Sequence, residues 1–195
     1  MISRHEAISI ILGNTGQDDL VLSTTGMISR EVFSSCDRPG NFYMIGSMGL
    51  LSAFGLGLAL LRPDLRILAL DGDGSALMSL GTLPLISSEA PANLLHIILD
   101  NEAYESTGSQ PSISSRISLA EIGRASGYQS SIQVEDGCVL EQALQACSDV
   151  HGPHLILVKA GIASSGDVPR VSRTPMNIRD RFKAHIEGLT PECIR

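Results

Sequence analysis

The stretch that decides the fold is "RILALDGDGSALMSLGTLPLISSEAPANLLHIILDN", residues 66–101. It contains two nearly continuous apolar runs, 66–72 and 93–101, and each run stops at aspartate, glycine or asparagine. Between them, residues 75–89 carry apolar side chains at helical spacing. Continuous apolar runs are typical of strands buried on both faces, and a helix is the usual connection between parallel strands. The stretch therefore predicts a strand–helix–strand unit of a parallel sheet.

The same alternation continues on both sides of this unit. Further strands are expected at 20–24, 42–46, 128–134 and 154–160, and further helices at 3–14, 29–35, 49–61, 118–126, 136–149 and 177–187. The helix at 75–89 is expected to bend near Gly81 and Pro84, and residues 101–117 are expected to form a long polar loop. This order of elements predicts an α/β fold with a doubly wound, mostly parallel sheet.

The composition is that of a globular domain with a large covered surface. Of the 195 residues 43% are hydrophobic, only 18% are charged, and the net charge is −7. The charged fraction is below the usual value of about 25%, which suggests a subunit interface. The negative net charge argues against non-specific nucleic-acid binding, because that needs a basic face. We expect one domain, 1–195, in which 161–195 form a C-terminal arm and helix.

The sequence predicts neither export nor a membrane span. The N-terminal stretch has polar residues every few positions, unlike a secretory signal. The apolar segment 49–61 is shorter than the roughly 20 residues that cross a bilayer, and it predicts a buried helix. The four cysteines lie far apart, which fits a reducing compartment and offers no zinc or iron–sulfur site. A cytoplasmic protein is expected.

Glycine or asparagine follows four of the predicted strands, at Gly26, Gly46, Gly72 and Asn101. Ligands of doubly wound sheets bind at the carboxyl ends of the strands. All four turns are therefore expected to face one crevice.

Asp73 lies just beyond the strand at 66–72 and opens the helical segment. Glycines beside it let an anion approach, and free amides at a helix start favour phosphate, which a carboxylate would repel unless a divalent cation lay between them. Asp73 thus fits a Mg²⁺ ligand beside a diphosphate, with Asn101 and the carbonyl of Ala103 as further oxygen ligands. Taken alone, the Asp-Gly-Asp-Gly sequence is more often a tight turn, and an Asp-Asn pair is a common turn as well.

Two motifs carry a resemblance to a known family. The segment "GDGS" at 72–75 followed by "DN" at 100–101 resembles the thiamine diphosphate motif. "GSMGLLSAFGLGLAL" at 46–60 resembles the segment that holds the aminopyrimidine ring in pyruvate-decarboxylase-like enzymes. By this resemblance the Gly46 carbonyl accepts a hydrogen bond from the ring, and Met48 is the apolar wedge that bends the cofactor. The alternative for Met48 is an ordinary core methionine.

Four longer segments narrow the resemblance. They are similar to the sulfopyruvate and phosphonopyruvate decarboxylases, and they read "STTGMISREVF", "DRPGNFYMIGSMG", "DGDGSALMSLG" and "DNEAYESTGSQPS". The short chain favours the β subunit of a sulfopyruvate decarboxylase. The resemblance implies a lyase that uses thiamine diphosphate and Mg²⁺ to convert 3-sulfopyruvate to sulfoacetaldehyde and CO₂. The alternatives are a phosphonopyruvate decarboxylase subunit that yields phosphonoacetaldehyde, and a cofactor-binding scaffold without catalysis of its own.

The resemblance also implies a set of site residues. Gly46 and Met48 are the catalytic ones, and Asp73, Asn101 and Ala103 are the metal ligands. The cofactor-binding residues are Thr24, Thr25, Gly26, Gly46, Ser47, Met48, Gly72, Asp73, Gly74, Ser75, Asn101, Ala103 and Tyr104. Thr24 and Thr25 could instead cap a helix at 27–34, and Ser75 could cap its own helix.

Thiamine diphosphate catalysis needs an activating glutamate, which in this family comes from a pyrimidine-binding domain that nothing here matches. A separate α subunit is therefore expected to supply it and to form a hetero-oligomer with this chain. Glu6, Glu31 and Glu89 are expected to be solvated or at an interface.

The small anionic 2-oxoacid substrate would favour an arginine partner. Arg30 and Arg116 are the nearest candidates in the sequence, although the partner subunit could equally provide it. Glu105 stands where the sulfopyruvate enzymes are expected to have glycine, and this departure leaves the substrate open. His96 and His154 interrupt apolar strands and are expected to be buried structural residues.

Overall fold

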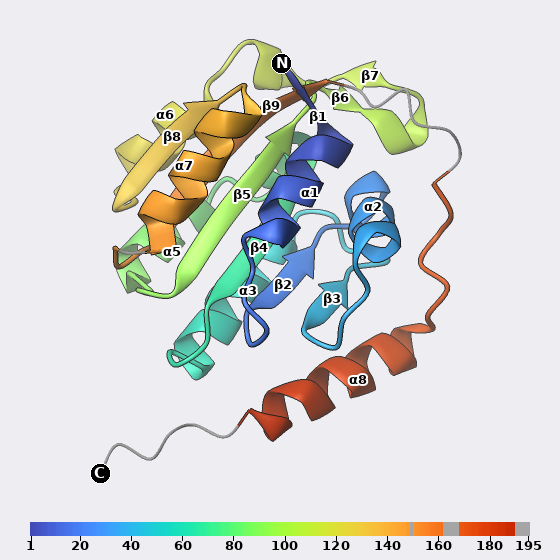
Figure 1. Cartoon of the computed structure of the whole chain (residues 1–195). Helices are drawn as coiled ribbons and strands as arrows, with labels where there is room; N and C mark the ends of the chain where they lie inside the picture. Colours follow the sequence, from blue (N-terminus) through green and yellow to red (C-terminus); the bar gives the residue numbers. More distant parts are fainter. Residues whose placement is uncertain (149, 162–167, 190–195) are drawn as a thin grey trace.

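A parallel sheet runs through the centre of the molecule in the computed structural model, which describes residues 1–148, 150–161 and 168–189 (Figure 1). Within these residues the sheet has seven strands in the order β3-β2-β4-β5-β9, and both β8 and β1 pair with the outer edge of β9. Every strand pair in it is parallel.

The helices and strands follow one another along the chain in an alternating order. They are β1 (Ile2–Ser3), α1 (Arg4–Gly13), β2 (Leu20–Ser23), α2 (Met27–Ser35), β3 (Asn41–Tyr43), α3 (Leu51–Leu61), β4 (Ile67–Gly72), α4 (Asp73–Met78), α5 (Thr82–Glu89), β5 (Leu94–Asp100), β6 (Ala103–Tyr104), β7 (Gln110–Pro111), α6 (Leu119–Ser126), β8 (Ser130–Val134), α7 (Gly137–Ser148), β9 (His154–Gly161) and α8 (Pro175–Gly188).

Helices cover the sheet on both faces (Figure 1). Alternate residues of the central strands point to opposite faces, so Leu68 and Leu70 of β4 join one core and Ile67 and Ala69 join the other. Side chains of α1, α2 and α7 complete the first core, and side chains of α3, α5 and α6 complete the second. The predicted α/β fold with a doubly wound, mostly parallel sheet is therefore confirmed.

The strand order reverses between β2 and β4. From β2 the chain moves outward to β3, whereas from β4 it moves in the other direction to β5. Connections therefore diverge at the carboxyl ends of β2 and β4, which leaves a crevice between them. Residues 24–26 and 72–75, at the ends of these two strands, line that crevice.

Several element boundaries differ from the prediction. The helix expected at 75–89 is two helices, α4 and α5, and it breaks at Gly81, whereas Pro84 lies inside the first turn of α5. The strand expected at 42–46 ends at Tyr43. Residues 101–117 contain the short antiparallel pair of β6 and β7 and two 3₁₀ turns.

The prediction that the apolar segment 49–61 is a buried helix is wrong in part. One side of α3 packs on the sheet, with Leu51, Leu56 and Ala59 buried. The opposite side is open, because Leu61 is 79% exposed and Leu60 is 48% exposed. A single helix on a sheet can bury only one stripe, so the remaining apolar side chains of α3 lie at the surface. Within the described residues no helix is long and apolar enough to cross a membrane.

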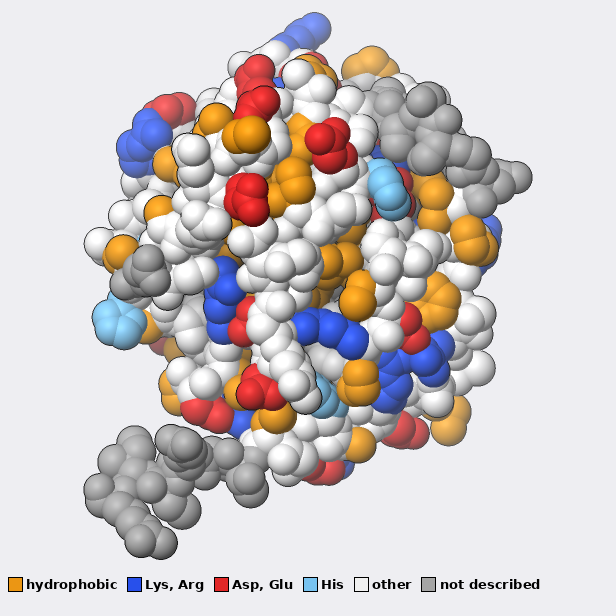
Figure 2. Space-filling view, viewed as in Figure 1, with side chains coloured by type: hydrophobic (Ala, Val, Ile, Leu, Met, Phe, Trp, Pro, Cys, Tyr) orange, Lys and Arg blue, Asp and Glu red, His pale blue; other side chains and the backbone are white. Residues whose placement is uncertain are grey.

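The structure covers most of the expected C-terminal arm and helix, including residues 168–189. Residues 168–174 have no regular secondary structure and lead to α8, which contacts β3. The remaining parts of the expected arm and helix, residues 162–167 and 190–195, lie outside the described residues. Figure 2 shows one face of the molecule, on which acidic side chains are scattered over the upper and the lower part, while Lys and Arg side chains gather near the start of α8.

The two strand histidines are buried, as expected. His96 Nδ1 lies 3.2 Å from the hydroxyl of Tyr128. His154 Nδ1 lies 2.7 Å from Ser130 Oγ, and its Nε2 lies 2.9 Å from the carbonyl oxygen of Val150. Both rings are held by contacts inside the fold, which fits structural roles.

Candidate active site

The cleft at the strand reversal gathers most of the residues that the sequence singled out. It is lined by Arg4, Thr24, Thr25, Gly26, Met27, Ile28, Met48, Gly72, Asp73, Gly74, Ser75, Leu99, Asn101, Ala103, Tyr104, Glu105, Ser106 and Thr107. They come from the ends of β2, β4 and β5, from the first turns of α1 and α2, and from the loops before α3 and after β5. Residues far apart in the chain therefore meet at one edge of the sheet.

Asp73 is the first residue of α4 and is buried at the floor of this cleft. Its Oδ2 accepts a hydrogen bond from Ser112 and lies 3.1 Å from Ser114 Oγ. Burial raises the pKa of the Asp73 carboxyl, the negative charge of Asp100 raises it further, and the serine hydroxyls act in the opposite direction. A carboxylate in such a place is stabilised by a cation.

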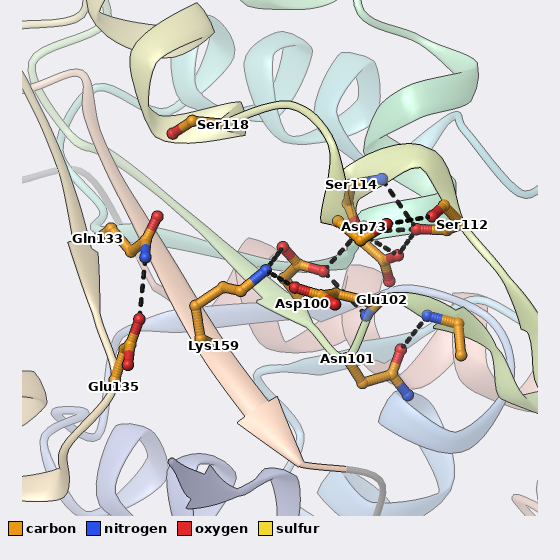
Figure 3. A network of polar contacts seen from close by, with 12 residues as sticks. Asp73, Asp100, Asn101, Glu102, Ser112, Ser114, Ser118, Gln133, Glu135 and Lys159 are labelled. Atoms are coloured by element: carbon orange, nitrogen blue, oxygen red, sulfur yellow. Dashed lines mark hydrogen bonds and ion pairs between the residues drawn. The ribbon is translucent and has the colours of Figure 1, made fainter.

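Asp100 is the acidic neighbour of Asp73, and a lysine neutralises it. Its Oδ1 lies 2.7 Å from Ser114 Oγ, so one serine bridges the two carboxylates (Figure 3). Its Oδ2 accepts a 2.8 Å hydrogen bond from Lys159 Nζ, which also donates to Glu102. Burial by itself would lower the pKa of Lys159, but the two carboxylates raise it above the ordinary value. Lys159 is therefore charged and compensates the acidic cluster.

Asn101 is held in one orientation by its neighbours. Its Nδ2 donates to Glu105 Oε2 over 2.9 Å, and its Oδ1 accepts from the amide of Ala103 over 3.1 Å. Since the nitrogen side of the amide is occupied by Glu105, the oxygen is the atom that remains available as a ligand. An amide oxygen is a suitable ligand for Mg²⁺.

A buried ion-pair cluster closes one end of the cleft. Arg4 donates to both carboxylate oxygens of Glu31 at 3.1 Å through Nε, and at 2.5 Å to Oε1 through Nη2. The same guanidinium forms an ion pair with Glu105. Arg4 and Glu31 are 3% and 1% exposed, so the expectation of a solvated or interfacial Glu31 is wrong. Its charge is tolerated because Arg4 satisfies it.

The chemistry of the donors fits a magnesium ion. Asp73, Asn101 and Ala103 all line the cleft, and together they offer a carboxylate, an amide oxygen and a backbone carbonyl. Hard oxygen ligands of this kind suit Mg²⁺. The described part of the chain has no group of three or more histidine, cysteine, aspartate or glutamate residues placed to bind a metal. A site with softer ligands is thus not found there.

Gly74 lies in close contact with the side chains of Tyr104 and Met48. A Cβ atom at this position would lie 2.4 Å from Tyr104 Cε1 and 3.0 Å from Met48 Cε. Only glycine leaves room for the Tyr104 and Met48 side chains to converge over the turn. The turn thus presents its backbone to the cleft, as the predicted approach of a diphosphate would require.

Ser75 joins two of the strand-end segments. Its Oγ accepts a 3.2 Å hydrogen bond from Thr24 Oγ1 and a 3.1 Å hydrogen bond from the amide of Gly49. Helix α4 has Gly72 as its N-cap and no side-chain cap, and α2 has Gly26 as its N-cap, also without one. Neither Ser75 nor the threonines therefore cap these helices.

The residues of the segment 46–48 divide between two hollows. Met48 lines the cleft, whereas Gly46 and Ser47 line a neighbouring hollow together with Phe42 and Pro175. Gly46 is exposed, and no heavy atom lies within 4 Å of a Cβ built on it. Of the expected cofactor-binding residues, only Gly46 and Ser47 lie outside the cleft lining.

The two arginines proposed for the substrate are not equivalent. Arg116 is exposed and lies outside the cleft lining. Arg30 lines a second groove, which shares Thr25, Gly26 and Ser106 with the cleft. Glu6 and Glu89 are exposed, in agreement with the expectation for these two residues.

Sequence reasoning missed the residues that support the site from a distance. Ser112, Ser114, Lys159 and Arg4 contact acidic residues in or next to the cleft, although each of these partners is far away in the chain. The sequence holds one local indication of these partners: Lys159 interrupts the apolar run of β9, and a charge inside a buried strand requires a partner.

Comparison with known proteins identifies the family. Residues 24–158 match the family described as "Thiamine pyrophosphate enzyme, C-terminal TPP binding domain". The chain is 40% identical to sulfopyruvate decarboxylase subunit beta of Methanothermobacter thermautotrophicus, over 98% of this chain and 100% of that protein. It is 36% identical to phosphonopyruvate decarboxylase of Streptomyces viridochromogenes, over 94% of this chain and 46% of that protein. The chain thus spans about half the length of this second relative.

Solved structures agree on the fold. The thiamine diphosphate-dependent 4-hydroxybenzoylformate decarboxylase of Rhodococcus jostii has a TM-score of 0.73 and 18% identity, over 84% of this chain and 33% of that one. Benzoylformate decarboxylase of Polynucleobacter necessarius has a TM-score of 0.71 and 18% identity, over 81% and 33%. Because the matched family spans more than half of the chain, this chain belongs to the thiamine pyrophosphate enzymes and carries their C-terminal TPP-binding domain.

Proposed function

We propose that this chain is the β subunit of a heteromeric decarboxylase that converts 3-sulfopyruvate to sulfoacetaldehyde and CO₂, with thiamine diphosphate and Mg²⁺. The observation that carries the proposal is the match to sulfopyruvate decarboxylase subunit beta, which extends over the whole length of that relative. The cleft supports it independently, because it combines a buried aspartate with two further oxygen ligands at a strand reversal.

The residues of the cleft would have distinct tasks. Asp73, the Asn101 amide oxygen and the Ala103 carbonyl would hold Mg²⁺, with Ser112 and Ser114 fixing the Asp73 carboxylate. Met48, beside the turn at Gly74, would pack against the cofactor. When bound, thiamine diphosphate supplies the electron sink that the loss of CO₂ from a 2-oxoacid requires.

A partner subunit would supply the activating glutamate. Glu105 is the glutamate that lines the cleft, and its carboxylate is already engaged by Arg4 and Asn101. Glu31 is buried against Arg4. These carboxylates are committed to the chain itself, so we infer that the group that moves the cofactor's proton comes from an α subunit.

A phosphonopyruvate decarboxylase is the second candidate. The 36% identity to the enzyme of Streptomyces viridochromogenes favours it, although this chain covers 46% of that protein. Cytoplasmic location is part of the proposal, and it is supported by Cys36, Cys138 and Cys147, which are free.

The test is decarboxylation by this chain together with its candidate α partner. Sulfopyruvate and phosphonopyruvate are supplied side by side with thiamine diphosphate and Mg²⁺, and CO₂ and the aldehyde are measured. Release of CO₂ mainly from sulfopyruvate, and only with the partner present, supports the proposal. Turnover of phosphonopyruvate alone would favour the second candidate, and absence of CO₂ from both despite cofactor binding would reject both.

A further inference from the structure

A groove next to the cleft concentrates positive charge in an otherwise acidic chain. It is lined by Thr25, Gly26, Ser29, Arg30, Met44, Ile45, Ser106, Arg170, Val171 and Arg173. Three of these residues are arginines and none is a carboxylate, whereas the whole chain has a net charge of −7. Lys and Arg side chains also gather near the start of α8 on the face shown in Figure 2.

The arginines of this groove differ in their partners. Arg173 is anchored, because its Nη2 lies 2.5 Å from Asp37 Oδ2 and its Nη1 donates to Asn177 over 3.1 Å. Arg30, on α2, and Arg170, in the segment before α8, have no side-chain hydrogen bond or ion pair with any described residue. Two guanidinium groups are therefore available to an anion.

The groove is continuous with the cleft. Thr25, Gly26 and Ser106 line both, and a Cβ built on Gly26 would lie 3.7 Å from Ser106 Cβ and Oγ. A ligand in the cleft can thus extend one end past Gly26 toward Arg30. Hydroxyl groups of Thr25 and Ser106 add hydrogen-bond donors along this path.

The cleft itself offers no free cation for an anionic end. Arg4 is the cationic side chain among its lining residues, and it is paired with Glu31 and Glu105. Asp73 and Glu105 add negative charge. Among the residues that line these two hollows, the unpaired cations that could attract an anionic tail are those of the adjoining groove.

We propose that Arg30 and Arg170 form the subsite that binds the tetrahedral oxyanion of the substrate, a sulfonate or a phosphonate, and so select 3-substituted pyruvates with an anionic tail. The inference rests on the proposed function, because it assumes a 2-oxoacid in the cleft. Guanidinium groups suit such oxyanions through paired, charge-assisted hydrogen bonds.

The experiment uses the complex of this chain with its partner subunit, loaded with thiamine diphosphate and Mg²⁺. The variants are Arg30→Gln, Arg170→Gln and the double variant, with Arg179→Gln as the matched control. Arg179 is an exposed arginine of α8 that pairs with Asp180 and lies outside both the groove and the cleft. Binding of sulfoacetate, an unreactive anion, is measured by calorimetry, and kcat and KM are measured for sulfopyruvate, phosphonopyruvate and pyruvate.

We expect each Gln variant to weaken sulfoacetate binding about tenfold to a hundredfold, the loss typical of a charged hydrogen-bonding partner. KM for both anionic substrates should rise by a similar factor, with kcat, the turnover of pyruvate and the cofactor affinity unchanged. The Arg179→Gln control should behave like the wild type.

Unchanged sulfoacetate binding and an unchanged KM in the double variant would overturn the proposal. An equal rise in KM for pyruvate would overturn it as well, because pyruvate has no anionic tail and the arginines would then act on another part of the substrate. If the wild type decarboxylates none of these acids, the proposed function fails, and the loss of sulfoacetate binding in the double variant still supports the anion subsite. The relative losses for sulfopyruvate and phosphonopyruvate show which oxyanion the groove prefers.

Discussion

Among the single residues, Asp73 is the one on which the proposed metal site depends. We predict that Asp73→Asn reduces the Mg²⁺-dependent affinity for thiamine diphosphate more than about 100-fold, beyond the loss typical of a residue that only supports a ligand. The protein should still fold, because asparagine keeps the shape and the contacts with Ser112 and Ser114 and removes the repulsion by Asp100. Calorimetric titration with cofactor at several Mg²⁺ concentrations measures the effect.

Asp180→Asn is the matched control for this substitution. Asp180 lies on the exposed surface of α8 and pairs with Arg179. Equal cofactor affinities of the wild type and Asp73→Asn at every Mg²⁺ concentration would reject Asp73 as a ligand.

Glu105 is predicted to act through Asn101. In Glu105→Ala the Asn101 amide loses the acceptor that fixes its orientation, so the Mg²⁺-dependent cofactor affinity should fall about tenfold. Glu105→Gln keeps an oxygen acceptor and should lose less. The same titration compares the two variants, and an equal loss in both would show that the charge of Glu105, which both remove, and not the orientation of Asn101, is what matters.

Gly74 is predicted to be irreplaceable because of Tyr104. Alanine at position 74 would place its Cβ 2.4 Å from the Tyr104 ring, so it should lower the free energy of unfolding by about 1–3 kcal/mol, as overpacking does. Gly81→Ala is the control: a Cβ at position 81 would have no heavy atom within 4 Å, so the free energy of unfolding should stay unchanged. Thermal unfolding of both variants tests this, and the additional substitution Tyr104→Ala should recover part of the loss.

The proposed metal ligands could be predicted from the sequence because they form local motifs at the ends of predicted strands. The residues that support them could not. Ser112 contacts Asp73 from 39 positions away, and Lys159 contacts Asp100 from 59 positions away. Nothing in a local pattern of hydrophobic and polar residues records such partners, since only the completed sheet brings them together.

At the scale of elements, one carboxylate contributes to the attachment of α8. Asp37 follows α2, accepts from Tyr43 of β3 over 2.9 Å, and pairs with Arg173 and with Arg181 of α8. Partial burial acts to raise the pKa of Asp37, but the hydrogen bonds from Arg181, Arg173 and Tyr43 outweigh it and bring the pKa below its usual value of 3.8.

The pH dependence follows from this depressed pKa. Asp37 should stabilise the fold at pH values above about 4, and the contribution should be lost as the pH falls through the lower folded-state pKa. We predict that Asp37→Asn costs about 1–2 kcal/mol at pH 7 and that the difference from the wild type shrinks toward pH 3. Denaturant unfolding at a series of pH values measures it, and a difference that stays constant with pH would contradict the prediction.

The order of the elements was predictable, whereas several of their boundaries were not. Buried apolar runs identify β4, β5 and β9, and their alternation with helices is sufficient for a doubly wound sheet. The two-residue strand β1 has no pattern of its own and exists because β9 offers it a free edge at Ala160 and Gly161. Similarly, β3 stops at Tyr43, since its pairing with β2 ends where β2 ends.

At the scale of the whole molecule, the expected cofactor-binding residues do not all line the cleft. The end that would hold the metal contains the buried Asp73 and the half-buried Asn101 and Ala103, whereas Gly46 and Ser47 lie exposed in a neighbouring hollow. Next to them in the chain, the apolar side chains of Ile45 and Leu50 are exposed as well. A second subunit that covers this region would complete the walls around the ring end of the cofactor.

We therefore predict that the isolated chain binds thiamine diphosphate weakly and that the partner subunit raises the affinity at least about tenfold. Binding to the folded state stabilises it by mass action, so saturating cofactor should raise the melting temperature of the complex more than that of the isolated chain. Calorimetric titration and thermal unfolding, each with and without the partner, measure both effects. Since Asp73→Asn removes the metal ligand and leaves the apolar surface intact, this variant should still assemble with the partner but lose the cofactor-dependent shift. Tight binding by the isolated chain, unchanged when the partner is added, would mean instead that this chain forms the whole cofactor site.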